Sequence, residues 1–347
     1  MEYRELGDFG IKVSVICLGS MTYGEQNTAD EAHEQLDYAL AAGVNFIDTA
    51  EIYPSPIFAE TQGDTESIIG DWIKKRKCRN DTVLAGKVSG PGLSLQWIRE
   101  GKTRLDKKNI TAAIDGSLRR LQTDYLDLYQ THWPDRNTNF FGAPNYSHKD
   151  KEQMTPLDET LSAMDDLVKA GKIRAFGVSN ETPWGLAECL RLAKDKSFPR
   201  VQSVQNPYNL LNRSYEIGMA EISARQRCGL LAYSPLAFGV LSGKYLNDNR
   251  PPQARLTLFG QYYKRYITDK AQAATADYIA LAKKHEINPA QMAVAFTVWQ
   301  PFLTSSIIGA TTMAQLKDNI AAVDIKPNEA LLLELEELGK KHFCPCP

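Results

Sequence analysis

The sequence predicts an α/β fold, a (β/α)8 TIM barrel that forms one domain over residues 1–347. Short apolar runs rich in β-branched residues alternate with longer amphipathic stretches from end to end, and there are eight such pairs. Strands joined by helices of this length run parallel, and parallel strands need helices on both faces of a sheet or a closed barrel. A doubly wound open sheet is the alternative, but no Gly-x-Gly-x-x-Gly follows the first predicted strand.

The predicted strands are short, mostly apolar and bounded by turn residues. They are Val15–Leu18, Asn45–Asp48, Thr82–Lys87, Leu126–His132, Ile173–Val178, Val204–Asn206, Leu230–Ser234 and Ser306–Ile308. Before them, Tyr3–Leu6 and Lys12–Val13 flank the turn residues Gly7-Asp8-Phe9-Gly10. We expect this N-terminal β-hairpin to cover the floor of the barrel.

The predicted helices show apolar residues at helical spacing. They are Asp30–Ala42, Thr65–Lys75, Lys108–Leu121, Leu157–Ala170, Trp184–Lys194, Asn212–Arg227, Pro289–Gln300 and Met313–Ala322. Gly43 and Gly171 directly follow two of them, as expected for residues that tolerate a left-handed cap. Thr312, with Gln315 three residues later, matches a capping box. Residues Asn328–His342 predict an extra C-terminal helix.

Four predicted connections are long, and each follows a strand: Pro54–Asp64, Val88–Asp106, Trp133–Thr155 and Ala237–Thr268. Barrels of this kind carry their active sites at the C-terminal ends of the strands, so insertions on this one face indicate function. The last connection contains five basic residues: Lys244, Arg250, Arg255, Lys264 and Arg265.

The composition excludes several classes of protein. The chain has 40 basic and 42 acidic residues, a net charge of -2, so no strong positive field attracts nucleic acid. No apolar run reaches the ~20 residues of a membrane span, and residues 1–6 do not resemble a signal peptide. The six cysteines are scattered, which favours a reducing compartment, and we expect a cytoplasmic protein. We expect Cys344 and Cys346 to be surface thiols without a function, with a redox or metal role as the alternative; no metal site is predicted.

Three of the predicted strands end in an ionisable residue, and a tyrosine closely follows one of these strands. Asp48, Lys87 and His132 close strands, and Tyr53 follows Asp48 by five residues. A barrel brings strand ends to one rim, so an acid, a phenol, an ammonium and an imidazole would meet there. Taken alone, each has a structural explanation: a turn cap, a loop aromatic, a solvated strand end and a hydrogen-bonded histidine. The regular placement at strand ends favours a common site.

This combination suits the reduction of a carbonyl group by hydride. Hydride transfer places negative charge on the carbonyl oxygen, which must then receive a proton. A free tyrosine has a pKa of about 10, and a nearby lysine ammonium stabilises the phenolate and lowers that pKa. An aspartate would hold the lysine in place, and a histidine could orient the carbonyl by a hydrogen bond.

The residues Phe46-Ile47-Asp48-Thr49-Ala50-Glu51-Ile52-Tyr53 resemble the signature of the aldo-keto reductase family. Lys87 and His132 fall where that family keeps its remaining catalytic pair. Other segments are also similar to its motifs: Gly177–Asn180, Gln205–Tyr208, Ala232–Leu236, Leu241–Tyr245 and Ile308–Thr312. The match covers nearly the whole chain in order and is most similar to the branch of bacterial Tas-type reductases and, more distantly, potassium-channel β-subunits.

The resemblance implies Tyr53 as general acid, with Asp48 and Lys87 as its electrostatic support and His132 as the group that orients the carbonyl. It also implies a nicotinamide cofactor whose carboxamide is hydrogen-bonded by Ser179, Asn180 and Gln205 and whose ring stacks on Tyr233. Strand-end capping is the structural alternative for Asn180 and Gln205. The residues implied to bind the cofactor are Ser20, Met21, Asp48, Ser179, Asn180, Gln205, Tyr233, Ser234, Pro235, Leu236, Gly239, Leu241, Gly243, Lys244, Arg255, Gly309, Thr311, Gln315, Asp318 and Asn319.

One departure concerns the 2′-phosphate of NADP. Compact members of the family place a lysine and an arginine where this chain has Gly309 and Gln315. Lys244 and Arg255 match positions at which the channel-subunit branch holds the cofactor's phosphates, and the helix beginning after Thr312 adds a favourable dipole. We therefore expect NADP(H) rather than NAD, unless both loop cations are simply solvated.

The residues expected to bind substrate are aromatic: Tyr23, Trp133, Phe140, Phe141 and Tyr208, with Trp97 as a further candidate. Arg136 and Arg213 lie in regions that could face the site. An aromatic mouth suits aldehydes and small ketones, but the sequence does not name the substrate. We expect an NADPH-dependent reductase of such small carbonyl compounds; the alternative is an NADP(H)-binding redox sensor that acts through a protein partner. The oligomeric state stays open.

Overall fold

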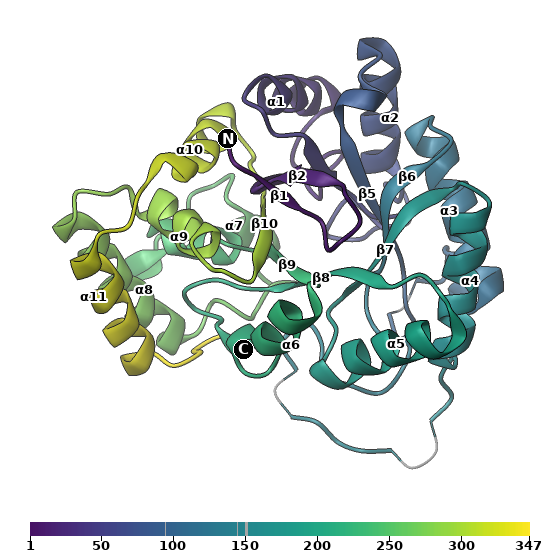
Figure 1. The fold of residues 1–347 in the computed structure, drawn as a ribbon. Helices are drawn as coiled ribbons and strands as arrows, with labels where there is room; N and C mark the ends of the chain where they lie inside the picture. The colour runs from purple at the N-terminus through teal and green to yellow at the C-terminus, as the bar shows by residue number, and fades with distance from the viewer. Residues whose placement is uncertain (94, 144, 150–151) are drawn as a thin grey trace.

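The computed structural model describes residues 1–93, 95–143, 145–149 and 152–347, and it contains a closed barrel of eight parallel strands (Figure 1). The order of neighbours is β10-β3-β4-β5-β6-β7-β8-β9. The strands are β3 (Ile16–Gly19), β4 (Phe46–Asp48), β5 (Val83–Val88), β6 (Leu126–Thr131), β7 (Ile173–Ser179), β8 (Val201–Pro207), β9 (Gly229–Tyr233) and β10 (Leu303–Ile308). Each overlaps one predicted strand, so the predicted barrel is confirmed.

Helices surround the barrel and connect successive strands (Figure 1). They are α1 (Ala29–Ala41), α2 (Asp64–Arg76), α3 (Lys107–Leu121), α4 (Leu157–Lys169), α5 (Pro183–Lys196), α6 (Met219–Gln226), α7 (Arg255–Phe259), α8 (Asp269–Lys284), α9 (Pro289–Val298), α10 (Met313–Ala321) and α11 (Glu329–Lys341). The Thr312 side chain accepts a hydrogen bond from the backbone amide of Gln315, as predicted. The Gln315 side chain, however, accepts from Thr311 rather than closing the capping box.

Three helices differ from the prediction. Helices α7 and α8 were not predicted, and both precede α9 in the connection between β9 and β10. The predicted helix from Asn212 begins only at Met219, because the Asn212 carboxamide oxygen accepts from the amide and hydroxyl of Ser214 and so stabilises a turn. Gly218 then adopts a φ of 86°, which ends the turn before α6.

The N-terminal hairpin closes the bottom of the barrel. Strands β1 (Tyr3–Glu5) and β2 (Lys12–Ser14) pair antiparallel. Leu6, Ile11 and Val13 are at most 4% exposed and pack against barrel residues that include Phe46 and Val83, the first residues of β4 and β5. The predicted floor is therefore confirmed, and it seals the end of the barrel opposite the C-terminal ends of the strands.

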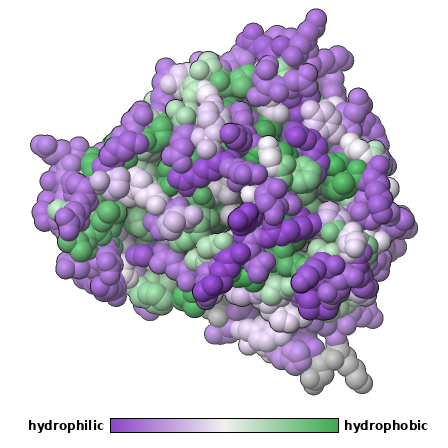
Figure 2. Space-filling view, viewed as in Figure 1, coloured by the Kyte–Doolittle hydropathy of each residue, from purple (hydrophilic) through white to green (hydrophobic). Residues whose placement is uncertain are grey.

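The face that carries the hairpin is mostly hydrophilic around its edge, with smaller apolar patches between the polar side chains (Figure 2). Within the described residues, no helix combines the length and the apolar character needed to cross a bilayer.

The C-terminal cysteines correct one expectation. Cys346 is buried rather than a surface thiol, and its backbone amide donates to the Leu211 carbonyl at 3.0 Å. Burial raises the pKa of the Cys346 thiol to about 12, which keeps it protonated. All six cysteines are free, and the described residues contain no group of three or more His, Cys, Asp or Glu side chains arranged to hold a metal ion.

Candidate active site

A cavity of about 1010 Å³ opens at the C-terminal ends of the barrel strands. Its wall includes Tyr53 and His132 and most residues implied to bind the cofactor: Ser20, Met21, Asp48, Ser179, Asn180, Gln205, Tyr233, Ser234, Pro235, Leu236, Gly239, Lys244, Arg255, Gly309, Thr311, Gln315, Asp318 and Asn319. The connections after β5 and β6 contain residues 94, 144 and 150–151, which lie outside the described residues. The predicted residues thus gather at one site, because the parallel barrel places every strand end on the same rim.

Lys87 and Asp48 form a buried ion pair at the base of this cavity. The Lys87 Nζ lies 2.6 Å from Asp48 Oδ2 and also donates to the Thr49 carbonyl at 2.8 Å. The other carboxylate oxygen, Asp48 Oδ1, accepts from the amides of Gln205 at 2.8 Å and Gln130 at 3.3 Å. Both partners of the ion pair therefore have several hydrogen bonds, as a buried pair requires. The role of Gln130 was missed, although a polar residue inside the apolar β6 was a usable signal.

Tyr53 lies directly above this pair. The Lys87 Nζ is 4.9 Å from the centre of the Tyr53 ring, and the His132 ring meets Tyr53 edge-on with the centroids 5.7 Å apart. Asp48, Tyr53, Lys87 and His132 come from the ends of β4, β5 and β6 and from the loop after β4. The predicted convergence of the four groups is therefore present in the structure.

The acidity of Tyr53 differs from the expectation. Burial raises the pKa of the phenol, and the opposing effect of Lys87 does not overcome it, because Asp48 acts against the lysine. We expected a phenol made more acidic than usual. In the protein alone Tyr53 instead remains protonated at neutral pH, which is the state that a proton donor needs.

His132 is a neutral imidazole in this environment. Burial and the positive charge of Lys87 hold its pKa well below the usual value of 6.5. Its backbone amide donates to the Val88 carbonyl at 2.8 Å, which fixes it at the end of β6. Its Nδ1 has no hydrogen-bond partner among the described residues. A neutral ring in this position can still donate one hydrogen bond into the cavity.

The amides predicted to hold the carboxamide form a connected group. Asn180 Nδ2 donates to the His132 carbonyl at 2.9 Å, and Asn180 Oδ1 accepts from the Tyr233 hydroxyl at 2.7 Å. The Ser179 hydroxyl donates to the Gln205 carbonyl at 2.8 Å. Asn180 has a φ of 53°, a left-handed conformation that asparagine tolerates and that is common at functional sites. These contacts hold the group rigidly beside Tyr233.

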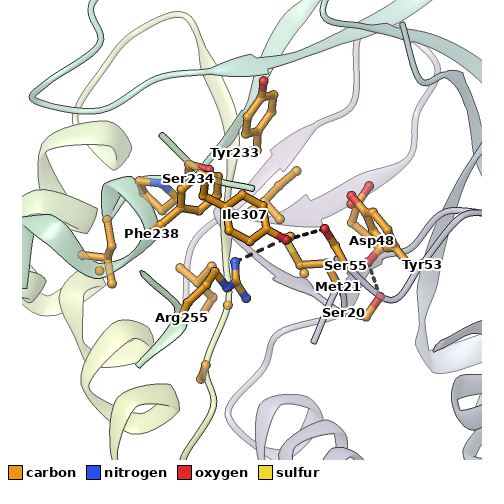
Figure 3. Close-up of a pocket in the computed structure, with 18 of the residues that line it drawn as sticks. Ser20, Met21, Asp48, Tyr53, Ser55, Tyr233, Ser234, Phe238, Arg255 and Ile307 are labelled. Atoms are coloured by element: carbon orange, nitrogen blue, oxygen red, sulfur yellow. Dashed lines mark hydrogen bonds between the residues drawn. The ribbon is translucent and has the colours of Figure 1, made fainter. Parts of the chain in front are cut away.

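Lys244 and Arg255 place two positive charges on another wall of the cavity. The Arg255 guanidinium lies between Phe238 and Met21, 5.7 Å from the centre of the Phe238 ring and 3.5 Å from Met21 Sδ (Figure 3). Its Nε donates to Gln26 Oε1 at 3.2 Å. Burial lowers the pKa of both cations, and Arg255 further lowers that of Lys244. Among the described residues, neither cation forms an ion pair with a carboxylate. Two enclosed cations without an acidic partner are the donor set of an anion site, so these residues fit phosphate groups.

The end of the cavity after β10 offers hydrogen bonds and one acidic residue, Asp318, rather than positive charge. Gln315 Oε1 accepts from the Thr311 amide at 3.0 Å, and Asn319 Nδ2 donates to the Gly309 carbonyl at 3.2 Å. The N-terminus of α10 begins beside them at Thr312, where its dipole favours negative charge.

Several predicted residues do not line the cavity. Tyr23 is fully buried and bonds to Gln35 Oε1 at 3.2 Å, and Tyr208 is fully buried and donates to Glu216 Oε1 at 2.6 Å. Trp133 packs behind His132 and donates to the Pro91 carbonyl at 2.7 Å. These three rings, which were expected to bind substrate, therefore lie outside the cavity wall and pack in the interior.

The two neighbouring phenylalanines differ in their position. Phe141 lines the cavity, as does Trp97, while Phe140 stacks against Trp133 behind the wall. Apolar lining residues that the sequence analysis missed are Ile52, Ile57, Leu93 and Leu95.

Four other residues that were predicted to contact cofactor or substrate, or that could face the site, also lie outside the cavity wall. Arg136 is paired with Glu181, and Arg213 is paired with Glu216 at 2.7 Å, so neither is a free cation. Leu241 is buried in the core, and Gly243, with a φ of 82°, makes the turn that leads to Lys244. The chain turns there with little steric cost because glycine has no side chain.

The fold and the four converging groups are those of an oxidoreductase with an eight-stranded barrel. A family model described as the aldo/keto reductase family matches residues 15–339, and the chain belongs to this family. Members of the family use NAD(P)H and act on small carbonyl compounds. The proteins named "Protein tas" from Escherichia coli (strain K12) and Shigella flexneri are each 48% identical over 347 residues, 100% of both chains. A "Probable voltage-gated potassium channel subunit beta" from Arabidopsis thaliana is 30% identical over 340 residues, 94% of this chain and 92% of its own.

Proposed function

We propose that this protein is an NADPH-dependent reductase that converts aldehydes and ketones to alcohols, with Tyr53 as the general acid. The observation that carries the proposal is the Lys87 ammonium, held 2.6 Å from Asp48 Oδ2 and 4.9 Å from the centre of the Tyr53 ring. NADPH, when bound, supplies the hydride. Tyr53 is the only group of the four that is protonated, uncharged and acidic enough to give its proton to an alkoxide.

Each neighbour of Tyr53 has a separate task in this proposal. His132 donates a hydrogen bond to the substrate carbonyl and orients it, which its neutral state permits. Tyr53 transfers its proton to the carbonyl oxygen and becomes a phenolate. Lys87 stabilises that phenolate, and Asp48 keeps Lys87 charged and in position.

The preference for NADP(H) over NAD rests on Lys244 and Arg255. In our proposal these cations hold the cofactor's phosphates, while Ser179, Asn180 and Gln205 hold its carboxamide. Dissociation constants for NADPH and NADH, measured by fluorescence titration, test this preference. Equal affinities for the two cofactors would contradict it.

The test of catalysis is a panel of aldehydes and ketones with NADPH, comparing the wild type with Tyr53→Phe. The substitution keeps the ring and removes the proton donor, so we expect turnover to fall at least ~100-fold while NADPH binding is retained. Tyr262→Phe is the matched control, because Tyr262 lines the same cavity without contact to Lys87. Retained activity in Tyr53→Phe would refute the assignment of the general acid.

The relative named as a probable potassium channel subunit favours a second candidate, an NADP(H)-binding redox sensor that acts through a protein partner. Tight NADPH binding with no turnover of any carbonyl compound would favour it over the reductase. For either function we propose a cytoplasmic location, which the six free cysteines support.

A further inference from the structure

Two further basic residues, Lys264 and Arg265, line the cavity and have no part in the proposed chemistry; Lys264 is exposed, and Arg265 is the more enclosed of the two. Arg265 is half-buried in the connection between β9 and α8, ten residues beyond Arg255 in the sequence. Its guanidinium lies against Gly142: a Cβ added to that glycine would be 2.6 Å from Arg265 Nε. Gly142 follows Phe141, which also lines the cavity. Arg265 therefore sits where the long connections after β6 and β9 meet.

The positive charge of Arg265 is not neutralised by any residue that the structure describes. Among the described residues, no carboxylate lies within ion-pair distance of it. The side chains that interact most strongly with the Arg265 guanidinium are the phenols of Tyr233 and Tyr266, and both raise its pKa. The other arginines that were candidates for the site do have acidic partners, since Arg136 pairs with Glu181 and Arg213 with Glu216. A guanidinium has five donors in a planar fork that matches a carboxylate, and phenol oxygens use few of them.

Arg265 is also close to the reacting groups. Tyr233 joins it to Asn180 through the 2.7 Å hydrogen bond, and Asn180 is bonded to the backbone of His132. Another part of the wall is apolar and includes Ile52, Ile57, Leu93, Leu95 and Trp97, and Phe141 precedes the glycine that Arg265 meets. The cavity thus offers both an apolar surface and a cation that, among the described residues, has no acidic partner. Lys244 and Arg255 already supply charge for the cofactor's phosphates, so the charge of Arg265 is available to another anion.

We propose that Arg265 binds an anionic group of the substrate, and that the physiological substrates are carbonyl compounds with an apolar or aromatic body and a carboxylate. This inference rests on the proposed reductase function and specifies its substrate class. Arg265 would hold the carboxylate while His132 and Tyr53 engage the carbonyl oxygen.

The test compares 3- and 4-carboxybenzaldehyde with 4-methylbenzaldehyde at saturating NADPH, for the wild type, Arg265→Met and Arg265→Lys. The measured quantity is the ratio of kcat/KM for the carboxylated aldehydes to that for the methyl compound. We expect Arg265→Met to lower this ratio about 10- to 100-fold, and Arg265→Lys to lower it less, since lysine keeps the charge but loses the fork. Arg250→Met is the matched control: it removes a guanidinium from the same connection but outside the cavity wall, and we expect the ratio to stay within about twofold of the wild type.

A binding measurement separates this inference from the proposed function. Isothermal titration calorimetry of benzoate into the NADPH-saturated protein should show binding that benzamide lacks, and Arg265→Met should abolish it. If no aldehyde is reduced but benzoate binding requires Arg265, the reductase proposal fails while the carboxylate site stands. An unchanged ratio in Arg265→Met, or benzoate binding that survives the substitution, would overturn the inference. An equal loss for both kinds of aldehyde together with weaker NADPH binding would overturn it too, because Arg265 would then only position Tyr233.

Discussion

The Lys87 ammonium and the Asp48 carboxylate lie 2.6 Å apart with no exposure of the lysine side chain to solvent. Each has further hydrogen bonds, to the Thr49 carbonyl and to the amides of Gln205 and Gln130. This network fixes a positive charge beneath Tyr53 without help from solvent, and a fixed charge stabilises a phenolate more than a mobile one does.

Asp48→Asn should destabilise the protein by about 3–5 kcal/mol, because it leaves the Lys87 charge buried without its partner. Adding Lys87→Met to Asp48→Asn should recover a large part of this loss, since the double variant no longer buries a charge. Urea unfolding of the two variants measures both effects. A double variant no more stable than Asp48→Asn would mean that the buried charge is not the cause.

The pH dependence of carbonyl reduction should show a plateau from about pH 6.5 to pH 10. Burial and Lys87 lower the pKa of His132, so the ring does not become charged as the pH falls through 6.5. Burial raises the pKa of Tyr53 above 10, so the proton donor is lost only above that value. Stopped-flow or steady-state kcat/KM across this range tests the prediction. A decline in rate centred on pH 6.5 would show that His132 titrates normally.

High pH should also weaken the folded state through Lys87. Burial alone would favour the neutral amine, but Asp48 and Tyr53 outweigh it and raise the pKa above 10.5. A group whose pKa is raised on folding contributes its full stability below its unfolded pKa and loses it as the pH rises through the folded value. The free energy of unfolding should therefore fall above pH 10.5 in the wild type, and this fall should be smaller in Lys87→Met.

Arg255→Met should stabilise the cofactor-free protein and weaken its binding of NADPH. The two enclosed cations, Lys244 and Arg255, repel each other when no phosphate is present, and removing one relieves this repulsion. We expect a higher Tm without cofactor and an NADPH dissociation constant about 10- to 100-fold larger. The control is Arg250→Met in the same connection, where an exposed arginine lies 3.7 Å from Asp248. If Arg255→Met bound NADPH as tightly as the wild type, the proposal that Arg255 holds the cofactor's phosphates would be wrong.

Tyr233→Phe should weaken NADPH binding modestly, by about five- to tenfold. The substitution keeps the aromatic face but removes the hydroxyl that donates to Asn180 Oδ1 at 2.7 Å, a hydrogen bond worth about 1 kcal/mol. Tyr208→Phe is the comparison: its hydroxyl bonds Glu216 outside the cavity, so stability should fall while cofactor affinity is kept. If Tyr233→Phe bound NADPH as tightly as the wild type, the Tyr233 hydroxyl would have no role in cofactor binding.

The repeated strand-helix pattern was sufficient to predict the barrel, because each period is a local property of the chain. The same holds for Asp48, Lys87 and His132. A polar residue at the end of an apolar strand is visible in the sequence, and a parallel barrel places all such ends on one rim. Helix α7 lies inside the connection Ala237–Thr268, which was predicted as one loop, and α8 lies between that connection and the predicted helix Pro289–Gln300, where no element was predicted.

The sequence alone could not predict which aromatic and basic residues face the cavity. Tyr208 and Phe141 are both aromatic residues that follow strands, yet one fills the core and the other lines the cavity. Arg136 and Arg265 are both loop arginines, and within the described part of the chain only Arg136 meets a carboxylate, that of Glu181, 45 residues along the chain. The sequence by itself determined the fold and the edge of the barrel at which Asp48, Tyr53, Lys87 and His132 meet, since these depend on local periodicity and strand position. Only the tertiary structure decided the raised pKa of Tyr53 and the unpaired charges of Lys244, Arg255 and Arg265. Those properties depend on burial and on distances between residues far apart in the sequence.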